Sequence, residues 1–143
     1  MTGIIRAVCQ SAEKGTVKHN TGQGELVANH GLRGDAHAGN WHRQISLLSL
    51  EKINDFRRRG AEVEDGAFGE NLVVEGIDFA QLPVGATLRC GDVVLEISQK
   101  GKDCHSRCAI FQKMGDCIMP REGVFAKVIR GGTIKAGDKI HAS

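Results

Sequence analysis

Short runs of alternating or β-branched residues recur along the chain, and glycine or Asp/Asn clusters separate most of them. Such runs predict strands. The expected strands are Gly3–Cys9, Glu25–His30, Gln44–Leu48, Glu70–Val74, Thr87–Arg89, Val93–Ser98, Val124–Ile129 and Thr133–His141. Short strands joined by tight turns are typical of a sheet that closes on itself. The pattern therefore predicts a mainly β domain closed into a barrel.

Two late segments, Gly85–Leu95 and Gly131–Ile140, resemble each other. Each has a Gly-Asp step between two β-rich runs, which predicts a hairpin turn. We expect two hairpins of one barrel rather than a repeat architecture, because two copies cannot build a solenoid.

Two further segments have helical patterns. In Leu50–Arg59 the apolar residues have helical spacing, Ser49 is placed to cap the start, and Gly60 is placed to end it. A second helix is expected over Ser106–Met114, with Gly115 as its stop.

Composition limits the class of protein. The 143 residues predict one domain, 1–143, and Lys plus Arg (19) nearly balances Asp plus Glu (17). This balance lacks the basic excess of a nucleic-acid-binding domain. No run approaches the ~20 apolar residues of a spanning helix, and the first residues do not resemble a signal peptide. We therefore expect a cytoplasmic protein without nucleic-acid or membrane partners.

The densest chemistry lies in Lys102–Phe111, followed by Cys117. In a reducing compartment the chain's five cysteines favour reactive thiols, metal ligands or buried small side chains over disulfides. Cys108 would lie in the first turn of the second expected helix, where unpaired N–H groups favour a thiolate. His105 and Arg107 add polarising or positive character. Cys108 is thus a candidate nucleophile or soft-metal ligand, with a buried, inert thiol as the alternative.

A structural zinc site competes with this interpretation. Cys104, His105, Cys108 and Cys117 supply four potential ligands. However, no pair has Cys-x-x-Cys spacing, so the signal for zinc is weak.

A second constellation spans Gly31–Arg43 and carries Arg33, Asp35, His37 and Arg43. Glycine lets backbone N–H groups approach an anion, and arginine binds phosphate or carboxylate as a fork. Asp35 could orient the imidazole of His37. The alternative is a polar surface loop in which Asp35 serves a turn.

A third constellation is the glycine-bordered turn and strand of Asp65–Val74. Glu70 or Asn71 could project into a pocket, or Asn71 could bond the turn backbone. Phosphate-binding P-loop, dinucleotide-binding and Gly-x-Ser-x-Gly motifs are absent from the chain.

Taken in order, these segments resemble the MOSC domain, named for the C-terminal domain of molybdenum cofactor sulfurases. The similarity covers about residues 25 to 140. The matching pieces are Gly31–Gly39, Arg43–Leu48, Gly66–Leu72, Leu82–Leu88 with Gly91-Asp92, the cysteine segment, Gly123–Gly132 and Gly137-Asp138.

The resemblance implies a closed, bent β-barrel of the MOSC or pyruvate-kinase-barrel type with a few short helices. It also implies a cleft cysteine, which falls on Cys108, carrying sulfur as a persulfide or ligating molybdenum. The resemblance also implies that the residues facing the cofactor are His37, Arg43, Glu70 and Asn71.

Larger relatives hold domains that this sequence does not match. It lacks the β-rich N-terminal domain of the amidoxime-reducing enzymes and the aminotransferase-like domain of full sulfurases. We therefore expect no pyridoxal phosphate, and retention of the molybdenum cofactor (molybdopterin) stays open. Cys104 and Cys117 are extra thiols that could resolve a persulfide on Cys108 by thiol exchange.

Three functions remain in competition. The first is sulfur transfer, with Cys108 loaded by a cysteine desulfurase or another sulfur donor, and with Cys104 and His105 assisting. The second is a molybdenum-dependent reductase of N-hydroxylated compounds, in which Cys108 ligates the metal and Arg33, Asp35 and Arg107 join the cofactor side. The third is a non-catalytic cofactor carrier. Expected partners are molybdenum cofactor biosynthesis proteins or a molybdoenzyme.

Overall fold

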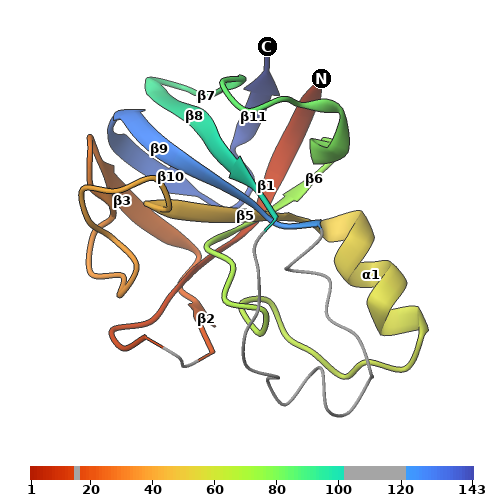
Figure 1. Ribbon diagram of the computed structural model, residues 1–143. Helices are drawn as coiled ribbons and strands as arrows, with labels where there is room; N and C mark the ends of the chain where they lie inside the picture. The colour runs from red at the N-terminus through yellow and green to blue at the C-terminus, as the bar shows by residue number, and fades with distance from the viewer. Residues whose placement is uncertain (15–16, 102–121) are drawn as a thin grey trace.

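The computed structural model describes residues 1–14, 17–101 and 122–143 (Figure 1). In these residues the elements are, in chain order, β1 Thr2–Gln10, β2 His19–Asn20, β3 Gln23–Val27, β4 Gly31–Leu32, β5 Ile45–Ser49, α1 Leu50–Arg58, β6 Leu72–Glu75, the 3₁₀ turn η1 Phe79–Gln81, β7 Thr87–Cys90, β8 Val93–Lys100, β9 Val124–Arg130, β10 Gly132–Lys135 and β11 Lys139–Ala142.

Seven strands close into a barrel in the order β11-β7-β8-β9-β5-β6-β1. The last contact pairs β1 with β11, with Thr2 opposite His141 and Gly3 opposite Ile140, so the barrel has no open edge there. Neighbouring barrel strands are antiparallel except β5 and β6, which run parallel and are joined through α1. The two termini lie together at one end of the barrel (Figure 1). The predicted closed β-barrel is confirmed.

A second, smaller sheet has the order β10-β3-β4. It corrects one prediction. The first predicted hairpin forms, since β7 pairs with β8 around Gly91-Asp92. The second does not, because β10 pairs with β3 whereas β11 pairs with β1 and β7.

A turn does form at Lys135–Asp138, within the second segment that was expected to be a hairpin. Asp138 donates its N–H to the Lys135 carbonyl (3.1 Å) and accepts the Lys135 N–H on Oδ2 (2.9 Å). It redirects the chain from one sheet to the other instead of folding it back. Thr133–His141 is therefore two strands rather than one.

Helix α1 forms where the sequence predicts it. Ser49 caps its start by accepting the Lys52 N–H, and the buried side chains are Ile53 and Phe56. Phe56 packs edge-on against Phe68, with ring centroids 5.6 Å apart. The second expected helix, residues 106–114, lies outside the described residues. No helix in the described part of the chain is long and apolar enough to cross a membrane.

The barrel wall separates two apolar clusters. The larger one includes Ile5, Leu47, Leu88 and Ile97, and the smaller one lies beneath α1. All five residues of β5 are buried, because one face of this strand contributes to each cluster. Burial on both faces explains why β5 reads as a nearly continuous apolar run.

Candidate functional site

The predicted cysteine centre lies outside the described residues. This applies to Cys104, His105, Arg107, Cys108 and Cys117. The chain on either side of it is fixed to the barrel. Lys100 is paired with Val124 at the end of the β8–β9 ladder, and Gly101 donates its N–H to the Gly123 carbonyl (2.7 Å).

The two cysteines that the structure describes carry unreactive thiols. Cys9 is fully buried, and burial, followed by the charges of Glu70 and Asp65, raises the pKa of its thiol to about 12. Burial, with a smaller effect of Asp138, also raises the pKa of Cys90. A thiol with a raised pKa stays protonated at neutral pH and is a poor nucleophile or ligand. Both fit the alternative of a buried small side chain.

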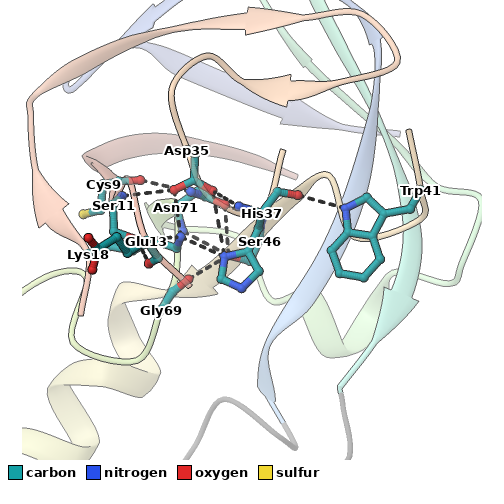
Figure 2. Close-up of polar contacts among 10 residues, drawn as sticks. All are labelled: Cys9, Ser11, Glu13, Lys18, Asp35, His37, Trp41, Ser46, Gly69 and Asn71. Atoms are coloured by element: carbon teal, nitrogen blue, oxygen red, sulfur yellow. Dashed lines mark hydrogen bonds and ion pairs between the residues drawn. The ribbon is translucent and has the colours of Figure 1, made fainter. Parts of the chain in front are cut away.

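Asp35 turns inward from its loop (Figure 2). Its carboxylate is fully buried, forms a 2.7 Å ion pair with Lys18 and accepts the Ser11 N–H at 3.1 Å. Burial alone raises the pKa of this carboxyl, but the Lys18 hydrogen bond, the Ser11 N–H and the Lys18 charge together outweigh burial and lower it. Asp35 is therefore an ionised anchor inside the protein, and its Oδ2 also accepts the N–H of His37 (3.2 Å), as in a turn.

The imidazole of His37 is contacted through Lys18 rather than by the carboxylate directly. Nζ of Lys18 lies 3.0 Å from Nδ1 of His37, whereas Asp35 Oδ2 lies 4.0 Å from the same nitrogen. Lys18 thus lies closer to the imidazole than Asp35 does, and orientation of the imidazole by Asp35 stays a prediction. The His37 side chain is 39% exposed, so part of it reaches the surface.

Glu70 and Asn71 are fully buried in the same region. Glu70 accepts the N–H groups of Gly66 and Phe68, each at 3.0 Å. Asn71 accepts the Ser46 N–H (2.9 Å) and donates to the Cys9 carbonyl (3.0 Å). Both side chains thus hold the chain's own backbone, but the Asn71 side chain bonds β5 and β1 rather than the turn backbone that the alternative named. Their contact with a cofactor stays a prediction.

Burial makes Glu70 unusual among the carboxylates. It raises the pKa of Glu70 to about 7, although the N–H groups of Gly66 and Phe68 act in the opposite direction, and nearby Asp65 adds to the rise. Glu70 therefore changes charge near neutral pH.

The two arginines of the loop differ in setting. Arg33 forms an ion pair with Glu25 at 3.1 Å, and both side chains are more than half exposed. Arg43 donates from Nε to Gln99 (3.1 Å), and its guanidinium lies 5.2 Å from the Phe125 ring centroid. Within the described part of the chain no hydrogen bond involves its two terminal nitrogens, which suit an anion.

The segment between His37 and Arg43 is tied at several points. The Trp41 indole donates to the His37 carbonyl (2.8 Å), as Figure 2 shows, and Ser98 on β8 donates to the His42 carbonyl. These two hydrogen bonds hold the backbone of the loop that carries His37 and Arg43.

The sequence model of the MOSC domain matches residues 34–141. The chain belongs to the MOSC domain family. No protein of curated function matches it significantly.

Solved structures share the MOSC fold of this chain. YuaD of Bacillus subtilis superposes with a TM-score of 0.82 at 20% identity, covering 99% of this chain and 96% of YuaD. YiiM of Escherichia coli gives a TM-score of 0.65 at 22% identity, covering 100% of this chain and 70% of YiiM. YiiM of Geobacillus stearothermophilus gives 0.66 at 17% identity, covering 99% and 73%. At these identities the likeness shows the fold.

Sequence reasoning missed Lys18, Ser11 and Ser46, which complete the polar cluster of this MOSC domain. Lys18 stands alone among polar residues, and no periodicity marks it as buried. Only the tertiary structure brings it to Asp35, 17 residues away.

Among the described residues no cluster of three or more His, Cys, Asp and Glu could hold a metal ion. The zinc alternative depended on the cysteine segment and stays a prediction. The His37 side chain is 39% exposed, and Arg43 contacts Gln99 through Nε.

Proposed function

We propose that this MOSC domain carries sulfur as a persulfide on Cys108 and delivers it within molybdenum cofactor metabolism. The observation that supports this most directly is the family match across residues 34–141, which includes Cys108. The described cysteines support it by elimination, because Cys9 and Cys90 are buried and their pKa values are raised. The reactive thiol then belongs to the cysteine segment.

The sulfur step balances without an added oxidant. The Cys108 thiolate attacks the outer sulfur of a persulfide on the donor protein, a new S–S bond forms, and the donor's S–S bond breaks with its thiolate as leaving group. The reverse sequence passes the sulfur on to a thiophilic acceptor. A cysteine desulfurase is the donor class that supplies such a persulfide.

Arg43 lies beside the described residues that lead into the cysteine segment. Gln99, which accepts from Arg43, lies two residues before Gly101, the last described residue ahead of that segment. A cationic guanidinium suits an anionic persulfide or a phosphate.

The molybdenum cofactor fits the described residues through its phosphate. His37 and Arg43 would hold that group, while the buried Asp35, Glu70 and Asn71 support the loops around it. When bound, the cofactor supplies redox chemistry at molybdenum, and Cys108 would be the soft ligand. This arrangement is the basis of the reductase alternative and of the carrier alternative.

Native mass spectrometry tests the proposal on protein purified without oxygen from a molybdate-fed host. Wild type incubated with a cysteine desulfurase and cysteine should gain single sulfur atoms. Cys108→Ala should gain none, Cys104→Ala should load slowly, and the matched control Cys90→Ala should load like wild type. Equal loading of wild type and Cys108→Ala contradicts the proposal. A molybdenum–pterin mass lost in Cys108→Ala supports the ligand role instead, and turnover of N-hydroxylated compounds then separates reductase from carrier.

A further inference from the structure

A cavity of about 400 Å³ opens between the β7–β8 turn, β10 and β11. Asp92 of the turn, Thr133 of β10 and Lys139 of β11 are among the residues that line it. It lies at the Val93 end of β8, whereas the chain leads into the cysteine segment from the Lys100 end (Figure 1). A strand rises about 3.3 Å per residue, so the two ends of the eight-residue β8 lie roughly 23 Å apart.

The main-chain groups of Thr133 point away from β3, the strand with which β10 pairs. In an antiparallel pair a residue directs both its N–H and its C=O either toward the partner strand or away from it, and the two cases alternate along the strand. Lys135 directs both groups to Asp138, at 2.9 and 3.1 Å, so Thr133, two residues earlier, also directs its groups away from β3. The Glu25 carbonyl opposite Thr133 agrees with this, because it accepts the Arg33 N–H (2.9 Å) on the β4 side of β3.

This edge of β10 faces the cavity. Among the described strands none pairs with it, since β10 ends the order β10-β3-β4. Asp138 covers the edge at Lys135, and both Asp138 and Thr133 line the cavity. The remaining outward pair of β10 is the N–H and C=O of Thr133. One such pair is too short an edge for an added peptide strand, but it suits a small ligand.

Two charged side chains of the cavity have no partner in the part of the chain that the structure describes. Asp138 accepts a backbone N–H at 2.9 Å, and the His141 ring lies 3.0 Å from a threonine hydroxyl. The exposed Asp92 carboxylate and Lys139 ammonium, by contrast, form no hydrogen bond or ion pair within those residues, not even with each other. A cavity with one uncommitted charge of each sign is complementary to a ligand that carries both signs.

We propose that this cavity binds a free α-amino acid as its zwitterion. The ligand carboxylate accepts from the Thr133 N–H and from Lys139, and the ligand ammonium donates to the Thr133 C=O and to Asp92. One carbon joins the two charged groups of an α-amino acid, just as one carbon joins the N–H and C=O of Thr133. The ligand therefore meets Thr133 as a partner residue does in an antiparallel ladder. The cavity volume leaves room for the ligand's side chain. This proposal does not depend on sulfur transfer by Cys108.

Titration with glycine, followed by NMR of the Gly91 and Thr133 amides, tests the proposal on the intact protein at pH 7. Glycine should shift both signals. It should bind about tenfold or more tightly than methylamine or acetate, since each of these carries only one of the two charges. Diglycine separates its charges by a further peptide unit and should also bind more weakly than glycine. Equal or tighter binding of any of these three compounds contradicts the assignment to an α-amino acid, and a glycine titration without a shift overturns the site.

Variants test the individual contacts. Asp92→Asn and Lys139→Met should each weaken glycine binding about threefold, whereas Glu96→Gln and Lys127→Met, exposed residues outside the cavity, should bind like wild type. Thr133→Pro removes the N–H, and proline is tolerated at an edge where that group points away from the ladder. A folded Thr133→Pro protein, followed through the Gly91 amide, should bind glycine about tenfold more weakly. Unchanged binding in both charge variants, or in folded Thr133→Pro, overturns the proposal.

Discussion

Glu70 gives this protein a pH dependence of stability that one substitution should remove. Its side chain is fully buried, and its pKa is raised from 4.5 to about 7. Because the folded protein holds the proton more tightly than the unfolded chain, this contribution to stability is fully present below pH 4.5. It is lost as the pH rises from 4.5 through 7.

The size of the effect follows from the shift. A rise from 4.5 to about 7 corresponds to about 3 kcal/mol of unfolding free energy lost across that interval. Glu70→Gln has nearly the same shape but does not titrate. Its amide oxygen still accepts one N–H from Gly66 or Phe68, while the other loses its acceptor, which costs about 1–3 kcal/mol at every pH.

Urea unfolding followed by circular dichroism measures this between pH 4.5 and 8. Relative to wild type, Glu70→Gln should gain about 3 kcal/mol from the acid to the alkaline end. The exposed β8 variant Glu96→Gln is the matched control and should follow wild type. Parallel profiles for wild type and Glu70→Gln would refute the reasoning, since Glu70 would then ionise at its ordinary pH despite burial.

Three further predictions concern unfolding free energy, measured by urea at pH 6. Lys18→Met leaves its buried carboxylate partner unpaired and should cost about 3–5 kcal/mol, whereas Arg6→Met breaks an exposed pair and should cost under about 1 kcal/mol. Gly66→Ala should cost far more than Gly69→Ala. Both have positive φ, but only at Gly66 would the new Cβ lie 2.2 Å from a backbone carbonyl oxygen, that of Lys18. Asn71→Ala unpairs a buried N–H and a buried carbonyl and should cost several times more than Asn54→Ala on α1, about 1–3 kcal/mol for each group. Equal losses would contradict the burial argument for the lysine and asparagine pairs and the steric argument for the glycine pair.

The barrel was predictable because its strands carry local signals. The β7–β8 hairpin and α1 follow from turn residues, helical spacing and a capping serine, all of which lie close together in the sequence. The split between β10 and β11 was not predictable, because pairing partners far apart in the chain decide whether a turn closes a hairpin. The two-residue strands β2 and β4 are too short for a periodic pattern.

The candidate site was predictable only in part for the same reason. Asp35, His37 and Asn71 stand in recognisable motifs, but the lysine that joins two of them comes from a separate segment. Its burial is a tertiary property. The sequence predicts which polar residues lie near a site, but only the structure shows which of them are buried and which reach solvent.

Hydrogen bonds join the Lys18 segment to the Gly66 turn, and the Gly66 turn to Glu70. Lys18 donates its N–H to the Gly66 carbonyl (3.0 Å), and Gly66 donates its N–H to Glu70 (3.0 Å). Glycine is required at position 66 because its φ is +94° and the Lys18 carbonyl leaves no room for a Cβ. A change in Glu70 charge therefore acts on the turn that holds Lys18, and Lys18 in turn holds His37. Burial makes Glu70 sensitive to pH, and its contact with Gly66 connects it to the side chain that we expect to meet the ligand.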